Sequence, residues 1–188
     1  MELLEKSIKS ILPLPEEDWQ RFADCFSKAQ LHKGEYFSTE GKVEREIGFI
    51  CTGIVRAFYR TDQGIEYNKT FFVEGDFIGA YASLVSGKPN KINIQALTDV
   101  EYYKADYAAI KNLFKEYRQI ETFARLIAEQ FYIEKENREI ELVLLQADER
   151  YRIFQNQYPG IENQIPQYQI ASYLGITPTQ LSRIRAKR

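Results

Sequence analysis

The chain has little of what most metal and redox centres require. Its 188 residues include only two cysteines, Cys25 and Cys51, and one histidine, His32. Two thiols are too few for a zinc finger, an iron–sulfur cluster or a disulfide scaffold, and one imidazole cannot build a multi-histidine metal site. We therefore expect a cytoplasmic protein with inert thiols and no metal.

The sequence also lacks a long apolar run, a secretory signal and a phosphate-binding glycine loop. With 44% hydrophobic residues and no span of membrane length, it is typical of a soluble globular protein that does not enter a membrane. Residues 1–19 carry five acids and no apolar segment after a basic one, which is unlike a signal peptide. No G-x-x-x-x-G-K run and no Ser/His/Asp or Cys/His arrangement occurs, so we predict that the protein is not an enzyme.

The near-neutral charge of the whole chain conceals an uneven distribution. The formal net charge is −2, yet residues 150–188 contain six basic residues and one acid, a balance of +5. Residues 1–149 then carry −7. A basic end on an acidic body favours a polyanionic partner for that end, although a merely solvated basic segment is the common alternative.

Glycines recur at regular intervals in the first half of the chain. Gly41, Gly53, Gly64, Gly75 and Gly87 are 11 or 12 residues apart, and segments rich in β-branched and aromatic residues lie between them. Glycine supplies the positive φ that tight turns need. The pattern predicts short antiparallel strands that form a jelly-roll-like sandwich or roll over about 75 residues.

The period changes to that of a helix from Asp106 onward. Apolar or small residues follow at alternating steps of four and three, and no proline occurs before Tyr158. We expect one long helix over about 106–146 with an a/d seam. The sequence leaves open whether this seam pairs with a second copy or packs on the chain's own β-roll. The seam comprises Leu113, Tyr117, Ile120, Ala124, Ile127 and Phe131.

Residues 165–188 have the spacing of a helix-turn-helix. Ala171 permits close helix crossing, Gly175 suits the left-handed end of a first helix, and Thr177-Pro178-Thr179-Gln180 is a capping box that starts a second. Leu181 and Ile184 are expected to face inward, which leaves a polar and basic outer face without any acid. Ordinary helical hairpins are the alternative. The predicted DNA-binding residues are Thr177, Thr179, Gln180, Ser182, Arg183, Arg185, Lys187 and Arg188.

In this order the β-roll, long helix and helix-turn-helix resemble the Crp/Fnr family of bacterial transcription regulators over nearly the whole chain. The resemblance is carried by an ordered series of short motifs. They are Gly34-Glu35-Tyr36-Phe37, Glu40-Gly41, Ile50-Cys51-Thr52-Gly53-Ile54-Val55-Arg56, Gly75-Asp76-Phe77-Ile78-Gly79, Ala96-Leu97-Thr98-Asp99-Val100-Glu101, Ile170-Ala171-Ser172-Tyr173-Leu174-Gly175-Ile176-Thr177 and Leu181-Ser182-Arg183-Ile184-Arg185.

The resemblance implies an α+β protein with an effector domain over 1–146, which includes the dimerisation helix, and a DNA-binding domain over 147–188 whose wing is short or absent. It implies a homodimer that binds a palindromic operator in double-stranded DNA, with RNA polymerase a further candidate partner. Arg183 matches the arginine that the family directs toward a base, typically guanine.

One segment departs from the cyclic-nucleotide-binding members of the family. Where those relatives carry an acid for the ribose and an arginine for the cyclic phosphate, this chain has Ala80 and Asn90. Lys91 and Ser83 keep a cyclic nucleotide open as a ligand, but the replacements argue against cyclic AMP. The candidate effector pocket comprises Gly79, Ala80, Tyr81, Ser83, Leu84, Asn90 and Lys91.

The sequence thus predicts a dimeric DNA-binding transcription regulator of the Crp/Fnr type with an unknown effector. The alternative is a cyclic-nucleotide-type sensor or adaptor whose helix-turn-helix no longer binds DNA. A cupin-like enzyme on the β-roll would need a cluster of histidine and carboxylate ligands, which one histidine cannot supply.

Overall fold

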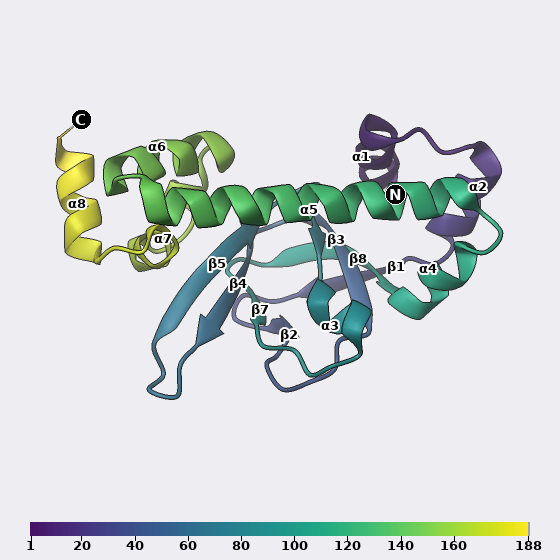
Figure 1. Ribbon diagram of the computed structural model, residues 1–188, viewed down its shortest axis with the longest axis horizontal. Coiled ribbons are helices and arrows are strands. Elements are labelled where there is room, and N and C mark those ends of the chain that lie inside the picture. Colours follow the sequence, from purple (N-terminus) through teal and green to yellow (C-terminus); the bar gives the residue numbers. More distant parts are fainter. Residues whose placement is uncertain (188) are drawn as a thin grey trace. The chain divides into compact units, whose positions relative to one another are not determined.

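The computed structural model describes residues 1–187, which form two compact units (Figure 1). The first unit contains residues 1–57 and 71–130, and the second contains residues 58–70 and the chain from 131 onward. Because the units are discontinuous in the chain, they do not coincide with the expected division between residues 146 and 147, which stays a prediction.

The helices and strands occur in the order α1 (Glu2–Ile11), α2 (Glu16–Ala23), β1 (Ser27–Leu31), β2 (Tyr36–Ser38), β3 (Glu46–Thr52), β4 (Val55–Arg60), β5 (Glu66–Phe72), β6 (Phe77–Ile78), α3 (Tyr81–Ser86), β7 (Asn93–Ala96), β8 (Val100–Asp106), α4 (Tyr107–Leu113), α5 (Arg118–Leu144), α6 (Ala147–Gln157), η1 (Ile161–Asn163), α7 (Gln167–Leu174) and α8 (Pro178–Ala186).

Two four-stranded sheets form the β-roll. The strand orders are β1-β8-β3-β6 and β2-β7-β4-β5. The pairs β1–β8, β2–β7, β3–β6 and β3–β8 are antiparallel. Side chains from both sheets, such as Ile50, Ile94 and Tyr102, meet in one apolar core. The predicted antiparallel roll is therefore confirmed.

The long helix begins later than the sequence indicated. The segment expected to be one helix from about residue 106 is two helices, α4 and α5, with a turn over residues 114–117. Ile110 of α4 and Ile120 of α5 are both buried, so the chain bends between them to bury both. No glycine or proline marks this corner, which is why the spacing across it continued without a visible break.

The predicted seam lies on the more covered side of α5. Ile120 is completely buried in the first unit, and Ala124, Ile127 and Phe131 are partly buried. Leu113 belongs to α4 and Tyr117 to the turn, so these two residues do not continue the stripe on α5. Ile120 is therefore a contact of the chain's own core, in line with the alternative that the sequence left open.

A different side of α5 carries exposed apolar residues in the second unit. Ile133 and Ile140 are seven residues apart and about half exposed, while Val143 and Leu144 are 80% and 70% exposed. A spacing of seven and then four places Ile133, Ile140 and Leu144 along one stripe of the helix. This stripe has no counterpart in the predicted seam.

Candidate nucleic-acid interface

The helices α7 and α8 form the helix-turn-helix that the sequence predicted. Gly175 ends α7 with a left-handed φ of 68°, which glycine adopts at little cost. Thr177 caps α8 through its side-chain oxygen, which accepts from the Gln180 N–H at 3.2 Å, and Pro178 occupies the first helical position. These local contacts fix the angle at which the second helix leaves the first.

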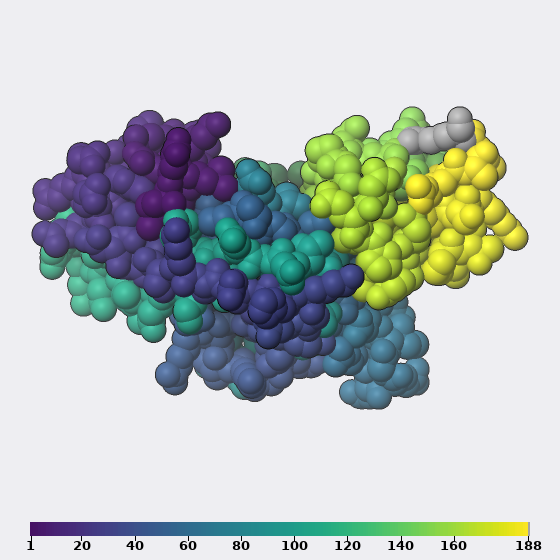
Figure 2. All heavy atoms as spheres, turned by 180° about the vertical axis from the view of Figure 1, so that it is seen from behind, coloured from purple at the N-terminus to yellow at the C-terminus, as the bar shows by residue number. Residues whose placement is uncertain are grey.

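The outer face of α8 is open along its whole described length. Leu181 is buried and Ile184 is partly buried, whereas every other side chain of the helix is exposed. The segment after residue 175 lies on the surface of its unit, in yellow in Figure 2. The exposed predicted residues are Thr177, Thr179, Gln180, Ser182, Arg183, Arg185 and Lys187; Arg188 lies outside the described residues.

Two of the predicted DNA-binding residues, Thr177 and Gln180, are already engaged in the helix cap. The Gln180 side chain accepts from the Thr177 N–H at 2.9 Å, while Thr177 caps α8 in return. Thr179, Ser182 and Arg183 are exposed on the outer face of α8. Arg183 is the longest of these three side chains and can form the two-pronged contact that distinguishes guanine.

Two arginines bind the carboxyl end of α7, where helix carbonyls have no partner within the helix. Arg138 of α5 donates to the carbonyl of Tyr173 and lies over its ring, 3.9 Å from the ring centroid. Arg150 of α6 donates to the carbonyl of Leu174 at 3.0 Å. Burial lowers the pKa of Arg150, and its positive charge complements the negative end of the helix dipole.

An aromatic cluster of Phe154, Tyr158 and Tyr173 packs α7 against α6 and the residue that follows it. The ring of Phe154 lies 5.5 Å from Tyr158 and 5.6 Å from Tyr173, and the last two rings meet edge to face at 5.9 Å. Burial raises the pKa of Tyr173, so its hydroxyl stays protonated and donates to Gln157. Such packed aromatic pairs hold the helix more firmly than area burial alone would.

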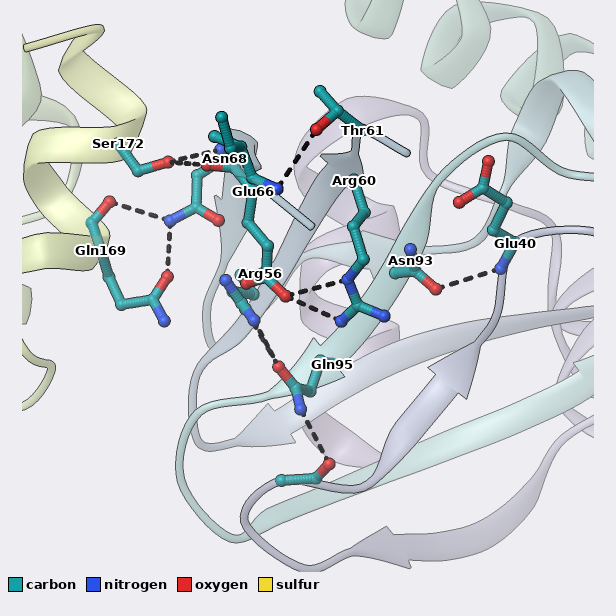
Figure 3. A network of polar contacts seen from close by, with 12 residues as sticks. Glu40, Arg56, Arg60, Thr61, Glu66, Asn68, Asn93, Gln95, Gln169 and Ser172 are labelled. Carbon is teal, nitrogen blue, oxygen red and sulfur yellow. Dashed lines mark hydrogen bonds and ion pairs between the residues drawn. The ribbon is translucent and has the colours of Figure 1, made fainter. Parts of the chain in front are cut away.

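The hairpin of β4 and β5 also contacts α7, through residues that the sequence analysis missed (Figure 3). Asn68 donates its amide to the carbonyl of Gln169 at 2.8 Å and to its side-chain oxygen at 2.7 Å. Ser172 contacts the backbone of the same strand. The one signal in the sequence is polarity at places where a strand and a helix normally bury apolar residues.

In the candidate effector pocket, the polar side chains of Ser83 and Asn90 form hydrogen bonds within the protein. Ser83 is buried, accepts from the Glu44 N–H at 3.0 Å and donates to the Lys88 carbonyl at 2.6 Å. Asn90 is also buried and bonds to Ser38 and to the backbone of Ile92. Both side chains therefore bond within the protein and close the loop around α3.

The other candidate pocket residues include no arginine, whose guanidinium could bind a phosphate through two hydrogen bonds. Ala80 is buried, a side chain on Gly79 would press on Leu84 at 3.3 Å, and Lys91 is exposed. Tyr81 packs edge to face on Tyr107, whose pKa is raised by burial and by their hydrogen bond. The residues at this place do not fit the arginine and carboxylate pair that holds a cyclic nucleotide.

Within residues 1–187, no three His, Cys, Asp or Glu side chains gather where they could bind a metal ion. Both thiols, Cys25 and Cys51, have a pKa raised mainly by burial, which keeps them protonated. None of the described helices has the length and apolarity that a bilayer crossing demands.

Comparison with known proteins agrees with this architecture. Residues 28–117 match the family model of the cyclic nucleotide-binding domain. The structure is similar to that of the c-di-GMP-responsive global regulator CLP of Xanthomonas campestris, with a TM-score of 0.72, 13% identity, and coverage of 92% of this chain and 91% of CLP. No curated protein sequence matches the chain.

Two further solved structures have the same arrangement. FixK2 of Bradyrhizobium japonicum has a TM-score of 0.74 at 18% identity, with 86% of this chain and 83% of FixK2 covered. A Crp/Fnr-family transcriptional regulator of Eubacterium rectale has a TM-score of 0.70 at 17% identity, with 93% and 83% covered. The chain has the fold of a Crp/Fnr transcription regulator. In this chain the β-roll, which contains the residues matched by the domain family, is followed by the long helix α5 and then by the helix-turn-helix. The solved structures share this order, so the fold implied by the sequence motifs is confirmed.

Proposed function

We propose that the protein is a dimeric transcription regulator that binds double-stranded DNA through α8. The observation that carries this proposal is the exposed face of α8, which presents Arg183, Arg185 and Lys187 without a neighbouring acid on the helix. A helix of this kind enters the major groove, where base edges carry a distinguishable pattern of donors and acceptors. The protein acts as a regulator in the cytoplasm and not as an enzyme, with RNA polymerase a candidate partner.

Within this proposal the side chains of α8 divide into two roles. Arg183, Thr179 and Ser182 contact base edges, with Thr177 and Gln180 held in the cap beside them. Arg185, Lys187 and Arg188 contact phosphates and make affinity fall with salt concentration. Residues 1–146 serve as the effector domain and 147–188 as the DNA-binding domain.

A dimer of this protein pairs the exposed stripe of α5 with its symmetric counterpart. Ile133, Ile140 and Leu144 lie at heptad-like spacing, and Asn137 lies within the same stripe. A polar residue within an apolar seam fixes the register of two paired helices at some cost in stability. A twofold dimer presents two copies of α8 and therefore requires a palindromic operator.

The proposal is tested by selecting binding sites from a pool of random double-stranded DNA with the purified protein. We expect an enriched palindrome that is bound at least about a thousandfold more tightly than bulk DNA at about 0.15 M salt. The matched measurement is a mobility shift of the selected site against a scrambled sequence of equal composition. Equal affinity for the two would overturn the proposal and leave the sensor or adaptor without DNA binding.

A further inference from the structure

Two loops of the first unit lie side by side, next to α3 (Figure 1). One follows β2 and contains residues 39–45, and the other follows α3 and contains residues 87–92. Asn90 joins them through its backbone: its N–H donates to the carbonyl of Lys42 at 2.7 Å, and its carbonyl accepts from the N–H of Gly41 at 2.8 Å. Residues 39–45 and 87–92 are called the loop pair below.

Buried side chains hold the loop pair in one geometry. The amide of Asn90 donates to the hydroxyl of Ser38 at 2.9 Å. The hydroxyl of Ser83 accepts from the N–H of Glu44 in one loop at 3.0 Å and donates to the carbonyl of Lys88 in the other at 2.6 Å. Asn90, Ser38 and Ser83 are all buried. Since buried polar groups are costly to leave unpaired, these bonds fix the backbone of both loops.

The outer side of the loop pair carries exposed lysines. Lys42, Lys88 and Lys91 are all exposed, and within residues 1–187 none of their ammonium groups forms an ion pair. Val43, the neighbour of Lys42, is 46% exposed, and Pro89 beside Lys88 is exposed as well. The buried bonds therefore display a basic surface that includes apolar side chains.

The charge around the loop pair favours a short anionic partner over an extended one. The loop pair contains four basic residues and two acids, a balance of +2, whereas residues 1–149 as a whole carry −7. A bilayer or a DNA duplex is wider than the loop pair and would also face the acidic residues around it, which repel a polyanion. A short acidic segment of a protein covers the lysines alone.

The apolar residues of the loop pair also argue against a bilayer. Membrane surfaces are bound through large apolar side chains such as Trp, Phe and Leu. The exposed apolar side chains of the loop pair are those of Val43 and Pro89, which are small. They suit contact with one apolar side chain of a peptide.

We propose that the loop pair is a docking surface for an acidic segment of a partner protein. Lys42, Lys88 and Lys91 pair with carboxylates of that segment, and Val43 contacts an apolar side chain between them. Because Ser83 and Asn90 already hold the loops, binding costs little ordering of the backbone. The inference is independent of DNA binding, and it gives a use to a segment that does not fit a cyclic nucleotide.

The test uses the whole protein and two short synthetic peptides. Glutamate alternates with leucine in the first peptide, and glutamine replaces each glutamate in the second. Nuclear magnetic resonance of isotope-labelled protein locates the bound peptide, and titration gives its affinity. The test variant combines Lys88→Glu with Lys91→Glu. The matched control combines Lys111→Glu with Lys115→Glu, which reverses two exposed lysines on α4 and in the turn after it. Circular dichroism checks that both variants fold.

We expect the glutamate peptide to shift the amide resonances of residues 39–45 and 87–92, and the glutamine peptide to leave them in place. The test variant should bind the glutamate peptide at least about fivefold more weakly, because two exposed ion pairs become repulsions. The control should keep the affinity of wild type. Unshifted loop resonances, equal binding of the two peptides or an equal loss in the control would each overturn the proposal.

Vesicles of phosphatidylserine with phosphatidylcholine and random duplex DNA complete the experiment. We expect neither to shift the resonances of the loop pair, because the acidic residues around it repel both. A shift of these resonances by vesicles or by DNA that the test variant abolishes would overturn the acidic segment and assign the surface to that polyanion.

Discussion

Gly53 joins β3 to β4 at a place where no side chain can be accommodated. Its φ is +96°, and a Cβ atom there would lie 2.4 Å from the carbonyl oxygen of Asp99. Gly53→Ala therefore combines backbone strain with a clash against rigid backbone, and we expect it to lower the free energy of unfolding by about 3 kcal/mol or more. Urea denaturation followed by circular dichroism measures the change.

Gly64 provides the matched control for this substitution. Its φ is +81°, but a Cβ atom would meet nothing within 4 Å. Gly64→Ala tests strain alone and should cost about 1 kcal/mol. Equal losses at the two positions would show that the contact with Asp99 has no part in the effect.

Arg183 is the residue on which sequence specificity is expected to depend. We expect Arg183→Ala to weaken operator binding by about 1–3 kcal/mol and to relax the preference at one base pair of each half-site. Fluorescence anisotropy with the operator and with single-base variants measures both effects. Arg152→Ala removes the same charge from an exposed position on α6 and should change neither the affinity nor the preference appreciably. Loss of affinity without any change in preference would assign Arg183 to a phosphate.

The charged residues could be counted from the sequence, but the sequence did not show which of their side chains are free to contact a partner. Arg150 contributed to the basic balance of residues 150–188, yet its guanidinium binds the carbonyls of Leu174 and Leu145. Ser83 and Asn90 were likewise assigned to the candidate effector pocket, but their side chains bond to the backbone of their own loop. Local spacing identifies which side chains are present, whereas their partners depend on residues far away in the chain.

At the scale of elements, the capping residues predicted α7 and α8 well because their signals are local. The cap by Thr177, the proline at the helix start and the left-handed Gly175 all involve neighbours within a few residues. The corner between α4 and α5 and the hydrogen bonds from Asn68 to Gln169 depend instead on contacts between residues far apart in the chain. A periodic stripe reports that one helix side is apolar, but not whether its own core or another chain covers it.

The exposed stripe of α5 makes a prediction about assembly. We expect Ile140→Glu to convert the dimer to a monomer, because it places two charges together in an apolar seam. Sedimentation equilibrium measures the change in mass. Ile65→Glu is the control, since Ile65 on the hairpin is 49% exposed and Ile140 is 48% exposed. A dimer that tolerates Ile140→Glu would move the interface away from this stripe.

At the scale of the whole molecule, fewer basic side chains are available to a partner than the charge balance of residues 150–188 suggests. Residues 131–149 add six acids and two basic residues to the unit that carries the helix-turn-helix. Arg150 is engaged at the end of α7, so the available positive charge among the described residues from 150 onward belongs to Arg152, Arg183, Arg185 and Lys187. Within the proposed function, we therefore expect weak non-specific attraction to DNA, and we expect the placement of two copies of α8 to supply the discrimination.

That placement leads to a prediction about the operator. A twofold dimer fixes the distance and the facing of its two recognition helices, and DNA repeats every ~10.5 bp. Inserting about 5 bp between the half-sites turns the second half-site to the opposite face of the duplex, so affinity should fall to that of a single half-site. Mobility shifts with the original and the extended operators measure the loss. Because monomeric Ile140→Glu already binds one half-site, it should be indifferent to the insertion, and an equal response of wild type would show that each copy of α8 binds independently.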